Sequence, residues 1–244
     1  IKAVPPWISA GPIFQFNPAI SLFVTCDSLE EIDALWQALI QGGTALMELG
    51  EYPFSTRFGW VQDRYGLTWQ LALADGKQQP DKITPYLLFS GTARGKALEA
   101  ARFYTDVFRA SGLAKANGAN DLAYQPESTP EGVHRFQLLG QPFLAMDHGF
   151  DADFTFNEAV SLIVSCDTQE EIDYFWQQLS HEPDAEACGW LKDRFGVSWQ
   201  IVPAQLDNLL AGGTPEQKQR LTDAVLQMKK LDIKAIQNAY AGQQ

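Results

Sequence analysis

Residues 14–41 read FQFNPAISLFVTCDSLEEIDALWQALIQ, and residues 154–181 read FTFNEAVSLIVSCDTQEEIDYFWQQLSH. The two segments lie 140 positions apart and are identical at 16 of their 28 positions. A second pair of segments lies 130 positions apart: residues 59–71 read GWVQDRYGLTWQL, and residues 189–201 read GWLKDRFGVSWQI. Repetition over blocks this long indicates duplication of a whole structural unit, with ten extra residues in the first copy around Glu51–Ser55.

Each copy predicts a strand, a helix and further strands. Residues 19–26 are apolar and β-branched, which is typical of a buried strand. Ser28 with Glu31, and Thr168 with Glu171, have the spacing of a capping box at a helix start. The apolar stripe that follows has the helical period of a core-facing surface, with Ile32, Leu35, Trp36 and Leu39 in the first copy and Ile172, Phe175, Trp176 and Leu179 in the second.

Residues 82–147 repeat this order with a different sequence. ITPYLLF at 83–89 predicts a strand, and a helical pattern follows through Ala97, Ala101, Tyr104 and Phe108. Residues 133–139 alternate, so His134, Phe136 and Leu138 share one face. Gly140-Gln141 suits a two-residue hairpin turn before a returning strand.

The last forty residues differ from the repeats. Thr214-Pro215-Glu216-Gln217 has the spacing of a capping box with proline at the first helical position. Asp232 is placed to cap a second, shorter helix. We expect these helices to dock on their own domain or on a partner.

The composition argues against several classes of function. The chain carries 18 basic and 30 acidic residues, a net charge of −12, so nucleic acid and anionic membranes are unfavourable partners. No apolar run approaches the roughly 18 residues that span a bilayer, and the first residues lack the plan of a signal peptide. Three cysteines are too few for a disulfide scaffold. We expect a reduced cytoplasmic protein.

Four ordered stretches identify a family. They are ITPYLLF at 83–89, ARFY at 101–104, FTFNEA at 154–159 and GWLKDRFGVSWQIVP at 189–203. Together they resemble the PhnB-like (3-demethylubiquinone-9 3-methyltransferase-like) branch of the vicinal oxygen chelate superfamily, which includes glyoxalases, bleomycin resistance proteins and extradiol dioxygenases. The resemblance implies an α+β fold of tandem βαβββ modules, whose open mixed sheets form a cup around a cleft, plus C-terminal helices.

The resemblance also implies a domain division. Residues 1–75 would be an incomplete first domain, mainly its second module, and residues 76–81 a linker. Residues 82–203 would be a complete domain of two modules, and residues 204–244 a helical tail. The first copy either lacks preceding residues or is an orphan module that pairs with a partner chain. Because one module has an unpaired sheet edge, we expect a homodimer or a pseudo-dimer within the chain, with the strands at 20–24 and 68–71 against another module.

The superfamily can hold a divalent metal at four positions, and here the matching residues are mostly neutral. The Glu of the closing strand corresponds to Gln200, and to Gln70 in the other copy. The leading strands offer Val160 and Thr84, and the remaining closing strand offers Ala145, Met146 or Asp147. Divalent cations prefer His and carboxylate ligands, so we expect no metal, no cofactor and no metal-dependent glyoxalase or dioxygenase activity. No strand is predicted to run through a glycine-rich turn into a helix, which argues against an adenosine-cofactor site and methyltransferase activity.

The candidate ligand site combines aromatic and neutral polar side chains. Alternation puts Ser198 and Gln200 on one face of the last strand, which the resemblance turns toward the cleft. Such a lining suits a small organic ligand. The predicted ligand-binding residues are Tyr86, His134, Trp190, Ser198, Gln200 and Gln70.

Three functions stay open at this point. The first is a protein that binds a small organic ligand without metal chemistry. The second is a metal-independent enzyme of the lyase, isomerase or transferase type, with His134 or Asp147 as catalytic residue, since imidazole works as a general base near neutral pH. The third is a structural or interaction module. For His134, a buried histidine with a hydrogen-bond partner is the alternative interpretation.

Overall fold

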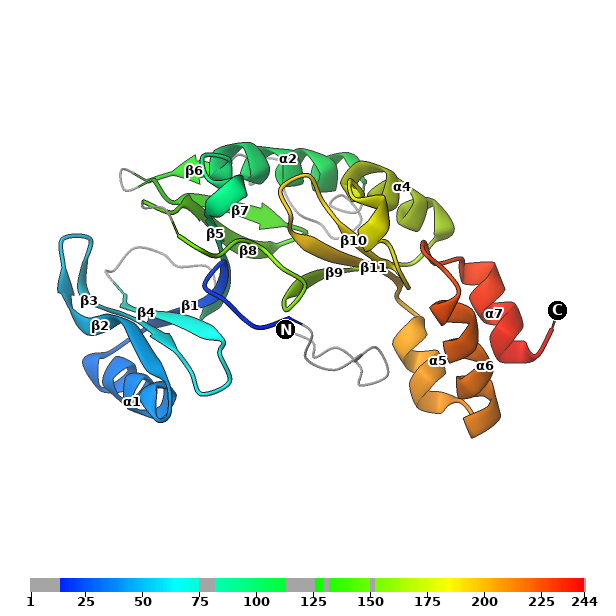
Figure 1. The fold of residues 1–244 in the computed structure, drawn as a ribbon, viewed down its shortest axis with the longest axis horizontal. Helices are drawn as coiled ribbons and strands as arrows, with labels where there is room; N and C mark the ends of the chain where they lie inside the picture. Colours follow the sequence, from blue (N-terminus) through cyan, green and yellow to red (C-terminus); the bar gives the residue numbers. More distant parts are fainter. Residues whose placement is uncertain (1–13, 75–81, 113–125, 130–131, 150–151, 244) are drawn as a thin grey trace. The chain divides into compact units, whose positions relative to one another are not determined.

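The computed structural model describes residues 14–74, 82–112, 126–129, 132–149 and 152–243. They form two compact units, one of residues 15–156 and one from Asn157 onward. Each unit has its own mixed sheet and its own helices (Figure 1). The α+β class predicted from the sequence is confirmed.

The larger unit contains two βαβββ modules. The first consists of β1 (Ile20–Cys26), α1 (Leu29–Ile40), β2 (Thr44–Tyr52), β3 (Ser55–Gln62) and β4 (Thr68–Leu73). The second consists of β5 (Ile83–Phe89), the short helix η2 (Gly91–Ala93), α2 (Ala97–Ala110), β6 (Glu127–Ser128), β7 (His134–Leu138) and β8 (Gln141–Asp147). In both modules the first strand lies parallel to the last, and the other pairs are antiparallel.

The two modules share one eight-stranded sheet of order β2-β3-β4-β1-β5-β8-β7-β6. β1 and β5 join them as an antiparallel pair, with Ser21 opposite Tyr86. The prediction that the strand at 20–24 lies against another module is therefore confirmed, and the other module belongs to the same chain. The same prediction is wrong for the strand at 68–71, because β4 lies between β3 and β1 of its own module. The sheet joins strands from both sides of the predicted linker, residues 76–81, all of which lie outside the described residues. The predicted domains divide the chain by sequence similarity. The two compact units divide it by strand pairing, so the unit boundary falls elsewhere than the predicted domain boundaries.

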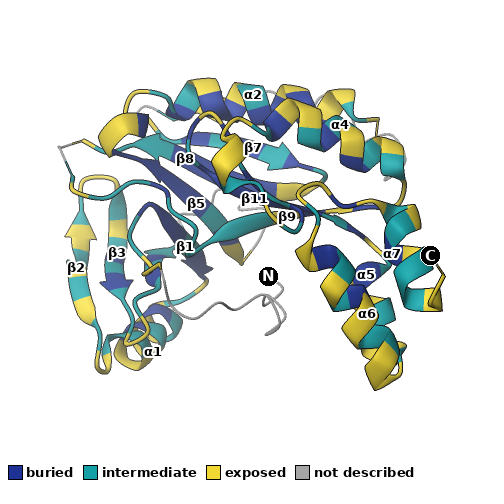
Figure 2. Cartoon of the chain, turned by 45° about the vertical axis from the view of Figure 1, so that its right-hand side comes forward, coloured by how far each residue is buried: buried dark blue, intermediate teal, exposed yellow. Residues whose placement is uncertain are grey.

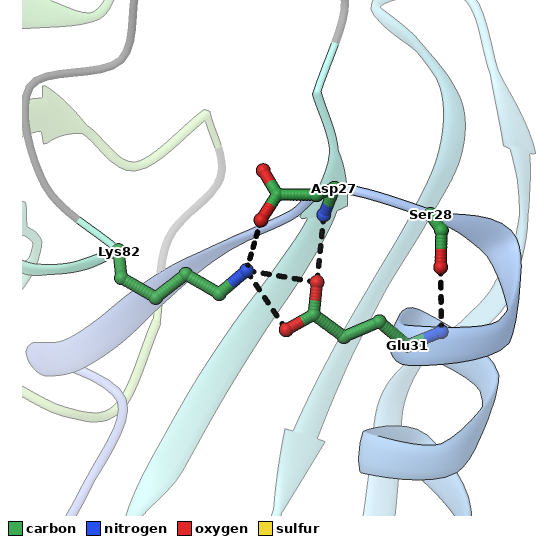
Figure 3. A network of polar contacts seen from close by, with 4 residues as sticks. All are labelled: Asp27, Ser28, Glu31 and Lys82. Carbon is green, nitrogen blue, oxygen red and sulfur yellow. Dashed lines mark hydrogen bonds and ion pairs between the residues drawn. The ribbon is translucent and has the colours of Figure 1, made fainter.

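An ion-pair network fixes the junction of the two modules (Figure 3). The Lys82 ammonium, just before β5, contacts the Asp27 carboxylate at 2.9 Å and the Glu31 carboxylate at 2.8 Å. Glu31 also accepts a hydrogen bond from the Asp27 N–H at 2.7 Å, and its own N–H donates to the Ser28 hydroxyl at 3.1 Å. The predicted Ser28 cap is confirmed, and the end of β1, the start of α1 and the start of β5 are linked.

Helices α1 and α2 cover the same face of this sheet. The Trp36 side chain of α1 packs among Val24, Cys26, Val61 and Leu71, and Tyr104 of α2 stacks on Phe136 of β7 at a ring distance of 6.3 Å. Side chains alternate between faces along each strand, and registered neighbours share a face. Both helices carry their buried residues toward the sheet (Figure 2). We call the opposite face the distal face.

The smaller unit contains one module and three further helices. Its sheet has the order β10-β11-β9, built from β9 (Ser161–Cys166), β10 (Trp190–Lys192) and β11 (Ser198–Pro203). Between β9 and β10 lie α4 (Gln169–Leu179) and the short helix η4 (Pro183–Ala185). The chain continues through α5 (Leu206–Gly212), α6 (Pro215–Leu226) and α7 (Ile233–Ala241), which pack around Leu221, Val225, Leu231 and Ile236.

The repeated segments agree in register and differ at their edges. Ser21 lies beside Thr68 on β1 and β4, as Ser161 lies beside Ser198 on β9 and β11. The ten extra residues of the first copy fall in the β2–β3 hairpin, where β2 forms an added edge strand. Trp36 is buried whereas its counterpart Trp176 is half-buried, so the two helices do not pack equally.

Most predicted helix starts and one predicted turn can be compared directly with the structure. Thr168 and Thr214 form complete capping boxes, and Asp232 caps α7. The sequence analysis missed α5. The hairpin turn predicted at Gly140-Gln141 is wrong by one residue: Leu139 and Gly140 make the turn, both with positive φ, as a two-residue hairpin of the primed type requires. Within the described part of the chain, no helix has the length and apolarity that crossing a membrane requires.

Candidate functional site

One cross-strand row of the larger sheet collects the candidate polar residues. Thr68 lies beside Ser21, Ser21 beside Tyr86, Tyr86 beside Leu144, and Leu144 beside Arg135, on β4, β1, β5, β8 and β7 in turn. Val24, Leu71 and Phe136 lie on the helix-covered face, and each is an odd number of positions away from the row residue on its own strand. Side chains alternate along a strand, so the row lies on the distal face. We call these five residues the distal row.

Gln70 binds Ser21 on this face. Its side-chain amide donates to the Ser21 hydroxyl at 2.8 Å, and both residues are buried. In the smaller unit Gln200 donates to Ser161 at 2.8 Å, at the matching positions of the repeat. Two predicted ligand-binding glutamines are therefore already engaged with a serine across the parallel strand pair, each in its own unit.

Two neighbouring polar groups have no hydrogen-bond partner within the part of the chain that the structure describes. The Thr68 hydroxyl is buried, with the residue 0% exposed, and it makes no hydrogen bond. The indole N–H of Trp60, which lies beside Gln70 on β3, is buried and also makes none. By contrast, the indole N–H of Trp69, on the covered face, donates to the Asp63 carboxylate at 3.0 Å. A buried donor without an acceptor is costly, and native proteins satisfy most such groups.

The smaller unit repeats this pattern residue for residue. Ser198 is 0% exposed and its hydroxyl has no partner, and the Trp190 indole N–H, beside Gln200, has none either. Trp199, on the other side of β11, donates to Asp193 at 2.8 Å. The predicted residues Trp190, Ser198 and Gln200 are thus brought together within this unit, as Trp60, Thr68 and Gln70 are within the larger one.

Tyr86 is the aromatic centre of the distal row. Its ring meets Phe23 edge to face at 6.2 Å, and its hydroxyl lies 3.4 Å from the Met146 sulfur. Burial raises the pKa of the phenol above its ordinary value, with the charge of Arg135 opposing the shift. The phenol is therefore a neutral hydrogen-bonding group at physiological pH.

Arg135 was missed by the sequence analysis. It alternates with His134 on β7 and lies on the distal face, where its guanidinium Nε is buried without a hydrogen-bond partner. The signal was present in the alternation of residues 133–139, which separates Arg135 from the buried apolar side chains. Charged residues at such positions are usually solvated, so the sequence alone favoured the ordinary interpretation.

The structure corrects the predicted grouping of His134 with Tyr86. His134 shares a face with Phe136, which α2 covers, whereas Tyr86 is on the distal face. The His134 ring lies 2.8 Å from the Ser128 hydroxyl. Burial lowers its pKa, and the Asp147 carboxylate partly offsets this. The buried histidine with a partner is the arrangement that the structure shows.

Asp147, the other catalytic candidate, caps α2. Its carboxylate accepts hydrogen bonds from the N–H groups of Gly95 at 2.7 Å and Ala97 at 3.2 Å. The chain from β5 into α2 passes through two single glycines, Gly91 and Gly95. Asp147 occupies the N–H groups that would bind a phosphate at such a turn.

The distal face does not fit a divalent cation. The Gln70 amide and the Ser21 hydroxyl bind each other, and their neighbours Thr84, Tyr86 and Met146 are neutral. Among the described residues, no group of three or more His, Cys, Asp or Glu side chains is placed to hold a metal ion. Metal coordination favours carboxylate and imidazole over neutral amide and hydroxyl groups. The lack of a metal tetrad itself stays a prediction.

A family model decides the relationship. The model for 3-demethylubiquinone-9 3-methyltransferase matches residues 7–72 and 81–202. The chain belongs to this family. The predicted family is therefore confirmed. The family match spans all three modules of the chain.

Solved structures match the chain over short segments. A putative 3-demethylubiquinone-9 3-methyltransferase (PhnB protein) from Bacillus cereus is 56% identical over 25% of this chain and 48% of its own, with a TM-score of 0.25. A Staphylococcus aureus protein is 42% identical over 22% and 45%, with a TM-score of 0.21. A Pseudomonas aeruginosa protein is 31% identical over 26% and 47%, with a TM-score of 0.25. The chain thus spans about half the length of these structures. No curated protein matches the chain.

Proposed function

We propose that this PhnB-like chain binds a small organic ligand on the distal face of the larger sheet, without metal chemistry. The ligand would lie over Tyr86 and Phe23 and exchange hydrogen bonds with the Thr68 hydroxyl and the Trp60 indole. Aromatic surface with a few fixed polar groups is the usual composition of a small-molecule site.

The observation that carries this proposal is the repeated pair of unpartnered polar groups. A single buried hydroxyl without a partner is an isolated cost of about 1–3 kcal/mol. This cost arises at matching positions of two modules, at Thr68 with Trp60 in one and at Ser198 with Trp190 in the other. A ligand that supplies an acceptor and a donor would offset it in each unit.

The enzymatic alternative has less support. His134 and Asp147 both lie on the helix-covered face, where they bind Ser128 and the start of α2. A catalytic base must reach a substrate proton within hydrogen-bond distance, directly or through one water. We therefore assign both residues to the support of the module and propose no catalytic residue.

The test is the isosteric variant Thr68→Val. Removing an unsatisfied buried hydroxyl should raise the free energy of unfolding by about 1 kcal/mol. It should also weaken binding of benzamide, a neutral aromatic amide, by about five- to tenfold, because one hydrogen bond to the ligand is lost. Thermal unfolding and a titration followed by NMR give the two numbers.

Thr105→Val is the matched control. Thr105 is equally buried, but its hydroxyl already donates to the Ala101 carbonyl at 2.7 Å within α2. This variant should lose stability and leave the affinity for benzamide unchanged. The proposal is wrong if Thr68→Val behaves like Thr105→Val, or if benzamide fails to bind with a saturable affinity.

A further inference from the structure

We propose that Arg135 binds an anionic group of the ligand, which makes the ligand of the distal face an organic anion with an aromatic or apolar body. This inference rests on the proposed function and specifies its substrate class. It assigns a binding role to a residue that the sequence pattern left among the ordinary surface charges.

Arg135 carries a buried donor that no described acceptor satisfies. Its guanidinium Nε is buried without an acceptor, and no described carboxylate forms an ion pair with it. Glu127 is its neighbour on β6, yet it is exposed and makes no ion pair with Arg135. An arginine whose donors are removed from water is stable when a carboxylate, phosphate or sulfonate accepts from its planar fork.

The same sheet offers a contrast. Arg57 on β3 is the other strand arginine of this unit, and it lies on the helix-covered side. Its Nε is also buried without a hydrogen-bond partner, but its terminal nitrogen binds the Asp33 carboxylate of α1 at 2.5 Å. The chain has 30 acidic and 18 basic residues, so carboxylates are abundant. In so acidic a protein, an arginine on the distal face without a described carboxylate partner is therefore unexpected, unless a bound anion takes the place of that carboxylate.

The spacing along the distal row gives the length of the ligand. Arg135 is separated from Tyr86 by one strand, which carries Leu144. Two strand spacings amount to about 10 Å on a flat sheet. The buried side chain of Leu144 supplies an apolar floor between the cation and the phenol. A ligand with one or two fused rings and an anionic substituent matches this length. The Arg135 charge also acts on the Tyr86 phenol, so the two groups share one electrostatic environment.

The test compares two probes that differ by one charged group. 8-Anilinonaphthalene-1-sulfonate is an aromatic anion, and N-phenyl-1-naphthylamine is the same ring system without the sulfonate. Arg135→Gln should weaken binding of the anion about tenfold, the size of a lost charge-assisted hydrogen bond, and leave binding of the neutral amine unchanged. Arg135→Lys should fall between, because it keeps the charge and loses the fork.

Arg57→Gln is the control, since the Arg57 guanidinium already has a carboxylate partner, Asp33, on the covered side. Both probes should bind this variant as they bind the unmodified chain. Unchanged affinity of Arg135→Gln for the anion would overturn the inference, and so would an equal loss for both probes, which would reveal a structural role. If neither probe binds the unmodified chain, the proposed function fails as well. Only the inference fails if the neutral amine binds, Thr68→Val weakens its binding, and Arg135→Gln leaves the affinity for both probes unchanged.

Discussion

Gln70 and Thr68 stand two positions apart on β4, yet only Gln70 has a hydrogen-bond partner. The sequence predicted the face of both residues, because alternation along a strand is a local property. It did not predict which polar group stays unpartnered, because that depends on the register of β1 against β4. It also grouped His134 with Tyr86 among the ligand-binding residues, since alternation gives a face within one strand and not which face a helix covers.

The cysteines give a prediction at the scale of single residues. Burial raises the pKa of Cys26 to about 11 and that of Cys166 to about 12, and it also raises that of the half-buried Cys188. Since thiolates are the reactive form, we expect 5,5′-dithiobis(2-nitrobenzoate) at pH 8 to label Cys188 slowly in the folded protein. Cys26 and Cys166 should react only in guanidinium chloride. Rapid labelling of all three thiols in the folded state would contradict these positions, and a Cys188→Ser variant identifies the first thiol.

The C-terminal helices provide a prediction at the scale of elements. Gly189 has a φ of +86°, and a Cβ there would lie 2.9 Å from the Leu231 side chain and 2.9 Å from the Ile201 carbonyl. Its N–H donates to the Lys229 carbonyl at 2.7 Å, which docks the segment before α7 on the module. Gly189→Ala should therefore cost about 3 kcal/mol in the free energy of unfolding.

Gly140→Ala is the matched comparison, because Gly140 has a φ of +84° and no atom within 4 Å of its Cβ position. Backbone strain alone should cost about 1 kcal/mol there. Chemical denaturation measures both variants. Equal losses would show that contact with Leu231 adds nothing to the strain at Gly189.

The junction network in Figure 3 predicts a pH dependence. The Lys82 hydrogen bond lowers the pKa of Glu31 below 4.5, and the Glu31 hydrogen bond raises the pKa of Lys82 above 10.5. Because the pKa of Glu31 is lowered, its carboxylate stabilises the fold above pH 4.5, and this stabilisation is lost as the pH falls through the lowered pKa. Because the pKa of Lys82 is raised, its ammonium stabilises the fold below pH 10.5, and this stabilisation is lost as the pH rises through the raised pKa. Lys82→Met should thus lower the melting temperature at pH 7 and progressively less toward pH 3. The exposed Lys234→Met is the control, and a Lys82→Met deficit that is independent of pH would argue against the network.

Elements were predicted best where several signals coincide. The α1 and α4 starts combine a hydroxyl cap, a Glu three residues later and a helical apolar stripe. α5 was missed because its start, Gln205, makes no side-chain cap, and its end runs into Gly212-Gly213. The turn at Leu139-Gly140 was shifted because Leu139 adopts a positive φ, which a leucine rarely does.

At the scale of the whole molecule, the repeat does not determine how the modules join. β1 pairs with β5 inside the larger unit, whereas β9, the matching strand of the smaller unit, is the edge of its three-stranded sheet. Nothing in one module's sequence determines which partner its edge takes, so the homodimer stays a prediction. We expect sedimentation velocity to give a dimer. Ile163→Lys, on β9, should shift it toward the monomer, because charged edge residues oppose strand pairing. A monomer at micromolar concentration would contradict this expectation.

The central claim is that the distal face binds a small organic ligand through its unpartnered polar groups. The most direct measurement follows the indole N–H signals of the seven tryptophans by ¹H–¹⁵N NMR during a titration with benzamide. A Trp60→Phe variant identifies the Trp60 signal. Our account predicts that this signal moves to lower field and saturates as an acceptor arrives, while the signal of Trp69, already bound to Asp63, stays in place. A Trp60 signal that stays unchanged up to millimolar benzamide, or moves no more than that of Trp69, would contradict the claim.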